Sequence, residues 1–166
     1  MMLRKLSVTM GVIFGFAASA MATDLPKEGT FSGTYTGFGT YRTIKIGSDR
    51  ALNVFDENGA ELTNGFADHM TWHCWGTGEV ANGEAVEQGY CVGTDPTGDL
   101  LEAKVADAKH PLMAKTRKAT VTYVAGTGKF TGISGAIEIV LHAGFRPLIA
   151  GTYVIYATEE GSYKLP

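Results

Sequence analysis

The chain has 166 residues, 45% of them hydrophobic and 19% charged, with a formal net charge of −3 at pH 7. This acidic balance argues against a nucleic-acid-binding protein, which needs a basic surface to contact phosphates. The length suits one domain with a buried core and is short for two.

Residues 1–22 have the pattern of a secretory signal peptide. Arg4 and Lys5 precede a short apolar stretch, and Ala20-Met21-Ala22 resembles a small-residue cleavage site. An uncleaved membrane anchor is the alternative, but the apolar stretch is too short to span a bilayer comfortably. We expect cleavage after Ala22 and a single domain over residues 23–166, periplasmic or secreted, with no membrane attachment once the signal is removed.

The predicted signal peptide holds two of the 14 basic residues and none of the 17 acidic ones, so residues 23–166 carry a net charge of −5.

Beyond residue 22 the chain consists of short runs rich in Thr, Val, Ile, Tyr and Phe, separated by glycines. The predicted strands are 30–38, 41–46, 51–55, 69–75, 87–92, 100–105, 118–124, 136–143 and 148–157. Strands at this spacing predict an all-β fold: an antiparallel barrel of about eight strands or, as second choice, a β-sandwich.

Two Asn-Gly pairs predict hairpin turns. Asn58-Gly59 and Asn82-Gly83 both match the type I′ turn, in which the two central residues need a positive φ. We expect each pair to form the tip of a hairpin.

The turn at 82–83 also predicts a disulfide. Its register places Cys74 directly opposite Cys91, at a site where Cα atoms lie roughly 4.5 Å apart, within the range of a disulfide. An exported protein meets an oxidising compartment, where such a bond persists. The alternatives are two free thiols, or a bulge that shifts the register. The same register sets Trp75 opposite Tyr90 on the other face of the hairpin.

The glycine-rich segment 124–135 carries a family resemblance. Its sequence V-A-G-T-G-K-F-T-G-I-S-G resembles the G-T-G-x-F-x-x-x-x-G signature of dirigent proteins, through Gly126, Thr127, Gly128, Phe130 and Gly135. This element also occurs in small exported bacterial proteins, a segment of which is similar to residues 90–99. Dirigent proteins and allene oxide cyclases share an eight-stranded antiparallel barrel with an apolar cavity, and the resemblance implies that fold.

The resemblance implies the fold rather than an activity. Dirigent proteins commonly carry arginines after the Phe of this element, where this chain has Thr131 and Ser134. A phosphate-binding loop is the alternative for the same glycines, but neither the P-loop spacing nor a following helix is present.

Two further motifs suggest metals, each with a simpler interpretation. His69 and His73 lie four apart in a predicted strand, so they can begin a zinc or copper site or be ordinary solvated histidines. No third ligand stands at a characteristic spacing. Asp95-Pro-Thr-Gly-Asp99 lacks the other ligands of a calcium loop and predicts a turn. We therefore expect no metal and no cofactor.

Glu138 and His142 are the candidate catalytic residues. They share one face of the predicted strand 136–143, and three aliphatic residues share the other. If the aliphatic face packs outward, the acid and the imidazole line the barrel and can transfer protons. If it fills the barrel, both are surface residues, which is the usual arrangement in an antiparallel sheet.

Tyr123, Tyr153 and Tyr156 are the candidate ligand-binding residues. The last predicted strand is apolar on both faces, which favours either a contact between copies of the chain in a homo-oligomer or a covered barrel wall. We expect Tyr153 or Tyr156 to face the interior, with its hydroxyl bonded to a partner.

The leading functional hypothesis is binding of a small apolar or amphipathic molecule inside the barrel, since barrels of about eight strands can hold one such ligand. One alternative is a cyclase, isomerase or dirigent-like protein that guides a reactive intermediate, with Glu138 and His142 as proton carriers. Another is a structural or interaction module whose interior is filled by side chains. No nucleophile motif supports a hydrolase.

Overall fold

The computed structural model describes residues 25–166; the predicted signal peptide and its cleavage site after Ala22 lie outside the described residues. Nine strands and one short 3-10 helix form within that range. The elements are β1 (Glu28–Lys45), β2 (Arg50–Thr63), β3 (Thr71–Ala81), β4 (Glu84–Thr94), β5 (Leu100–Asp107), β6 (His110–Pro111), β7 (Thr116–Gly126), η1 (Gly128–Phe130), β8 (Ser134–His142) and β9 (Thr152–Lys164). No helix among these residues is long and apolar enough to cross a bilayer.

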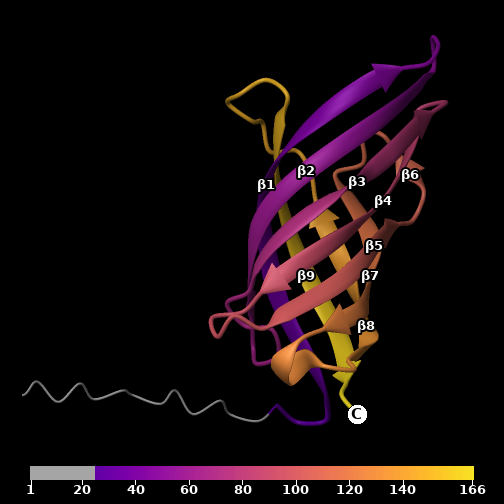
Figure 1. Ribbon diagram of the computed structural model, residues 1–166. Coiled ribbons are helices and arrows are strands. Elements are labelled where there is room, and N and C mark those ends of the chain that lie inside the picture. Colours follow the sequence, from indigo (N-terminus) through magenta and orange to yellow (C-terminus); the bar gives the residue numbers. More distant parts are fainter. Residues whose placement is uncertain (1–24) are drawn as a thin grey trace, which may run out of the picture.

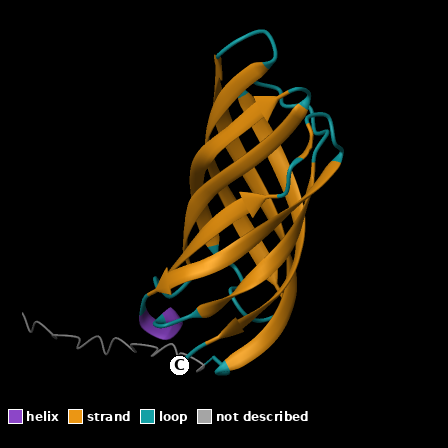
Figure 2. Ribbon diagram, turned by 90° about the vertical axis from the view of Figure 1, so that its right-hand side faces the viewer, coloured by secondary structure: helices purple, strands orange, loops and turns teal. Residues whose placement is uncertain are grey.

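The strands form a closed antiparallel barrel (Figure 1, Figure 2). Strands β1 to β5 pair in sequence order, β5 pairs with β7, and β7, β8 and β9 follow. Strand β9 then pairs with β1 and closes the ring. The two-residue strand β6 pairs with the start of β4. The predicted antiparallel barrel is confirmed, and the β-sandwich alternative was wrong.

The two ends of the barrel differ. We call the end with the β1–β2, β3–β4 and β8–β9 connections the mouth, and the end near η1 and the C-terminus the floor (Figure 1). Aromatic side chains pack the floor: the Phe66 ring stacks on Tyr163 at 4.0 Å between centroids and lies edge-on to Phe130 at 5.7 Å. Phe130, from the glycine-rich segment, is 1% exposed. Its burial explains why an aromatic residue stands in that element.

The hairpin at 82–83 has the predicted geometry. Asn82 and Gly83 have φ values of 53° and 79°, as a type I′ turn requires. The register that follows sets Cys74 opposite Cys91, and the two form a disulfide with their Cα atoms 4.0 Å apart. Trp75 lies opposite Tyr90 on the outer face, as predicted.

The prediction of a turn at Asn58-Gly59 was wrong. Both residues lie within β2, which runs without a break from Arg50 to Thr63. Gly59 faces the barrel interior, where a Cβ atom would lie 2.2 Å from the hydroxyl oxygen of Tyr35 on β1. The glycine is needed for a close approach between strands, and the actual β1–β2 connection lies at residues 46–49.

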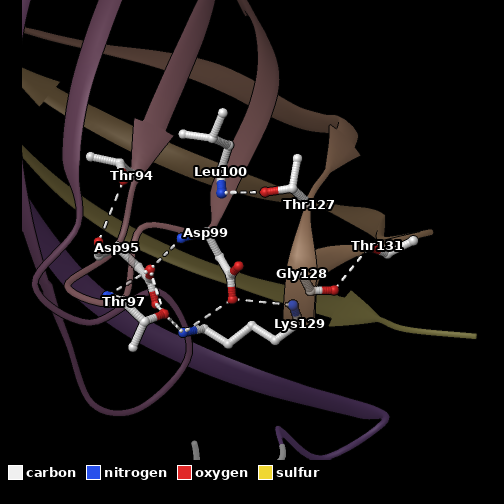
Figure 3. Close-up of polar contacts among 9 residues, drawn as sticks. All are labelled: Thr94, Asp95, Thr97, Asp99, Leu100, Thr127, Gly128, Lys129 and Thr131. Carbon is white, nitrogen blue, oxygen red and sulfur yellow. Dashed lines mark hydrogen bonds and ion pairs between the residues drawn. The ribbon is translucent and has the colours of Figure 1, made fainter. Parts of the chain in front are cut away.

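Residues 95–99 form the predicted turn, between β4 and β5. The Asp95 carboxylate accepts hydrogen bonds from the backbone N–H groups of Thr97 and Asp99, at 3.0 and 2.9 Å (Figure 3). The Lys129 ammonium group binds the same carboxylate. Bonds within the protein therefore occupy the oxygens that suggested a calcium loop.

The two segments that carry the family resemblance contact each other at the floor (Figure 3). The Lys129 N–H donates to the Asp99 carboxylate at 3.2 Å, and the N–H of Leu100, the residue after the first segment, donates to the Thr127 hydroxyl at 2.8 Å. Gly128 has a φ of 49°, and a Cβ there would lie 1.8 Å from the Asp99 carboxylate. The glycine motif thus lets the chain after β7 pack against the β4–β5 turn.

Candidate functional site in the barrel cavity

The barrel encloses a cavity of about 600 Å³. Thr43, Leu112 and Phe145 line it at the mouth, and Trp72 and Tyr123 line it deeper in the barrel. Strands β7, β8 and β9 supply an apolar wall of Val121, Ile137, Ile139, Leu141 and Ile155. A cavity of this size lies within the range of small-molecule sites, roughly 300–1,000 Å³.

The candidate catalytic pair does not line this cavity together. The aliphatic face of β8 points inward, and Glu138 points outward, where its carboxylate accepts a hydrogen bond from Lys118 at 2.6 Å. The Glu138 side chain is 60% exposed. His142 lies at the mouth with its ring 5.5 Å from that of Tyr156. Of the two orientations considered for β8, the structure has the one in which the aliphatic residues face the barrel interior and Glu138 faces the solvent.

Two of the three candidate tyrosines line the cavity. Tyr123 and Tyr153 point inward from β7 and β9. Tyr156 lies on the outward-facing register of β9, opposite His142 on β8 and Thr36 on β1. Tyr153 is therefore the inward residue of the pair 153 and 156.

Five carboxyl groups that the sequence interpretation missed also line the cavity. They are Glu57 and Glu61 on β2, Glu87 on β4, Asp107 on β5, and Glu159 on β9. Strand alternation contained a signal for one of them, because counting by twos from the inward Tyr153 leads to Glu159. The usual exposure of glutamate conceals this signal when the sequence is inspected alone.

Glycines on β1 make room for two of these carboxyl groups. A Cβ at Gly37 would lie 2.6 Å from Glu57 Oε1, and a Cβ at Gly33 would lie 2.8 Å from Glu159 Oε1. The carboxyl groups rest where the β1 backbone has no side chain. The glycines of the long strand β1 therefore shape the cavity wall.

The acids nearest the mouth are paired with a cation. The Arg117 guanidinium on β7 binds Glu87 and lies 3.2 Å from the Asp107 carboxylate. His110 adds a longer contact to Asp107, at 3.8 Å. Burial raises the pKa of Asp107 to about 6, although the positive charge of Arg117 opposes that shift.

Glu57 lies farther from the mouth along β2 and is bonded to tyrosine. The Tyr35 hydroxyl donates to Glu57 Oε1 at 2.6 Å. Burial raises the pKa of Glu57, and the hydroxyl groups of Tyr35 and Tyr153 only partly offset this. The carboxyl group is thus poised to hold or release a proton beside the cavity.

Glu61 and Glu159 are the deepest acids. They are 3% and 5% exposed, and Trp72 Nε1 donates to Glu61 Oε2 at 2.5 Å. Burial and the charge of Glu159 raise the pKa of Glu61, and burial also raises the pKa of Glu159. Two adjacent carboxyl groups in an apolar site cannot both ionise readily, so the pair retains a proton more readily than isolated glutamates do.

The histidines considered as metal ligands each face their own carboxylate. His69 lies in the connection before β3, beside Asp68 at 2.7 Å, and His73 points outward from β3 to Asp56 at 3.1 Å. No group of three or more His, Cys, Asp or Glu among residues 25–166 is arranged to hold a metal ion.

No protein-family model matches the chain, and no curated protein matches it. Its structure is similar to that of a pterocarpan synthase dirigent protein, with a TM-score of 0.52 and 11% sequence identity, over 97% of this chain and 98% of that one. Both the closed antiparallel barrel and this similarity agree with the resemblance of segment 124–135. The chain therefore has the fold of the dirigent and allene oxide cyclase-like barrel group.

Proposed function

We propose that this protein is exported and binds a small amphipathic molecule inside its barrel. The cavity of about 600 Å³ is the observation that supports the proposal. A barrel filled by its own side chains would have no such space, which disfavours the alternative of a purely structural module. The aliphatic wall suits an apolar body, and the carboxyl and tyrosine groups suit a polar end.

Native mass spectrometry of the protein purified from its own host tests this proposal. The expected result is a complex whose mass exceeds that of the denatured chain by one small molecule. Binding of a neutral apolar dye, N-phenyl-naphthylamine, provides a second measurement, with increased dye fluorescence as the readout. A protein that carries no molecule and binds no dye would contradict the proposal.

A pair of variants on β7 locates the bound dye. Val121 lines the cavity, and Val124 is exposed, 51%, on the outside of the same strand. Val121→Phe fills part of the cavity and should weaken dye binding at least about tenfold, equivalent to about 1.4 kcal/mol. Val124→Phe adds the same ring outside and should leave binding unchanged. Equal effects of the two variants would place the dye elsewhere.

Dirigent-like guidance of a reactive intermediate is the second candidate. It is favoured by the similarity to a dirigent protein and by Glu57, a buried acid bonded to Tyr35 beside the cavity. If a molecule found in the barrel is converted there, Glu57→Gln should slow its conversion and leave its binding nearly unchanged. Conversion at the wild-type rate in this variant would remove Glu57 from the mechanism.

A further inference from the structure

The deep end of the cavity contains acid without a matching base. Among residues 25–166, no Lys, Arg or His forms an ion pair with Glu57, Glu61 or Glu159. Arg117 binds Glu87 and Asp107 nearer the mouth. The carboxyl groups near the mouth therefore contact a cation, whereas those at the deep end do not.

Two oxygen atoms at the deep end also lack hydrogen-bond donors. Glu61 Oε1 and Glu159 Oε1 are buried, and no partner in the described part of the chain reaches either of them. Both side chains are more than nine-tenths buried, and both line the cavity. A proton retained by the pair lets one carboxyl group donate to the other, but the fully ionised pair lacks a donor for either oxygen and favours a ligand that supplies donors.

We propose that the molecule bound in the barrel is an organic amine, whose ammonium group binds between Glu61 and Glu159. This inference rests on the proposed function, because it names the chemical class of the same ligand. The apolar body of the amine lies along the aliphatic wall of β7, β8 and β9, toward the mouth.

The surroundings of the carboxyl pair match this group. An ammonium group has donors and no acceptor, so it can satisfy both unpaired oxygens. The aromatic rings of Tyr35, Trp72 and Tyr123 also line the cavity, and aromatic faces attract organic cations. A carboxylate ligand would instead meet repulsion from the acids, and a neutral alcohol would form weaker hydrogen bonds.

The bound cation replaces a proton. In the empty barrel, burial and the charge of the neighbouring carboxylate raise the pKa values of Glu61 and Glu159 and favour a proton on the pair, whereas the positive charge of a bound amine favours its loss. The other titratable groups that face the pair are Tyr35 from β1, Glu57 from β2 and Tyr123 from β7, with Asp68 in the connection before β3. Amine binding near neutral pH should release up to one proton.

Three probes of nearly equal shape test the proposal on the whole exported protein: naphthylmethylamine, naphthalenemethanol and naphthoate. Each competes with N-phenyl-naphthylamine for the cavity, and the displacement curve gives its affinity. The amine should bind at least about tenfold tighter than the alcohol, and naphthoate should bind most weakly. Calorimetry of the amine in two buffers of different ionisation enthalpy measures proton release without any substitution.

Neighbouring glutamates on β9 provide matched variants. Glu159→Gln, alone and with Glu61→Gln, keeps the side-chain volume and should bring the amine and the alcohol to within about threefold of each other. Glu160 is the next residue and is exposed on the outer face. Glu160→Gln should retain the preference of the wild-type protein for the amine.

The outcomes separate the two proposals. If the alcohol binds as tightly as the amine, or if the preference survives in the Glu61→Gln and Glu159→Gln variants, the amine proposal is overturned and cavity binding stands. If calorimetry detects no proton release when the amine binds, the statement that the bound cation replaces a proton is overturned. If none of the three probes displaces the dye and the dye itself does not bind, both proposals fail.

Discussion

The mouth and the deep end of the cavity accommodate buried acids in opposite ways. Near the mouth, the single positive charge of Arg117 on β7 is shared between Glu87 on β4 and Asp107 on β5. At the deep end, Glu61 and Glu159 face each other's charge, and among residues 25–166 the Trp72 N–H, which donates to Glu61, forms the one hydrogen bond to the pair. Arg117 offsets part of the cost of burying the acids near the mouth, whereas the deep acids have no such cation and are available to a proton or a ligand.

Removing the cation near the mouth should have the largest effect. Arg117→Met leaves Glu87 and the nearly inaccessible Asp107 side chain without their partner. The free energy of unfolding should fall by about 3 kcal/mol, as when one member of a buried ion pair is lost. Urea denaturation measures this change.

The adjacent residue supplies the control for Arg117→Met. Lys118 points outward and pairs with Glu138 in solvent, so Lys118→Met should cost less than about 1 kcal/mol. Equal losses in the two variants would mean that the pairing near the mouth contributes nothing beyond a surface ion pair.

Neutralising the deep pair should have a smaller effect of the opposite sign. In Glu61→Gln with Glu159→Gln, neither of the two deepest positions carries a carboxylate, and an amide oxygen can still accept from Trp72. We expect the free energy of unfolding at about pH 8 to rise by about 1–2 kcal/mol. Glu160→Gln, outside the barrel, should change it by less than about 0.5 kcal/mol. A loss of stability in the double variant would contradict the contrast between the two regions.

The pH dependence of the free energy of unfolding should show the same contrast between the two regions. Burial raises the pKa values of Glu61 and Glu159 above the ordinary 4.5, and that of Asp107 from 3.8 to about 6. The folded state then binds more protons than the unfolded chain, so these groups make the protein less stable as pH rises through that interval.

We expect the groups with raised pKa values to lower the free energy of unfolding by more than about 1 kcal/mol between about pH 5 and pH 7, because the shift of Asp107 alone contributes about that much. The double Gln variant should lose most of the fall that persists above about pH 6, since Asp107 accounts for the lower part. Thermal denaturation followed across this range provides the measurement. A profile that is unchanged in the variant would show that the deep pair does not titrate with folding.

Local features of the fold could be predicted from the sequence. The type I′ turn at Asn82-Gly83 involves neighbouring residues, and the register it sets carries along a regular ladder to Cys74 and Cys91. At Asn58-Gly59 the same local preference does not produce a turn. The same dipeptide lies inside a strand there, because the glycine accommodates the Tyr35 side chain of another strand.

The candidate site could be predicted only in part. Tyr123 and Tyr153 were assigned to it from their strands, and both line the cavity. Alternation along β8 separated Glu138 from the aliphatic residues without deciding which side faces inward. The missed carboxyl groups, such as Glu57 and Glu61, look like ordinary surface residues until the position of their strand in the barrel is known.

The sequence by itself determined the strand composition, the turn at 82–83 and the disulfide that follows from it, because these depend on backbone preferences within one hairpin. Only the tertiary structure decided which face of each strand is enclosed. Strand β1 pairs with β2 on one side and β9 on the other, and ring closure directs the carboxyl groups of Glu61 and Glu159 into the same interior. A period of two along a strand defines two faces, and only closure of the ring determines which one is inside.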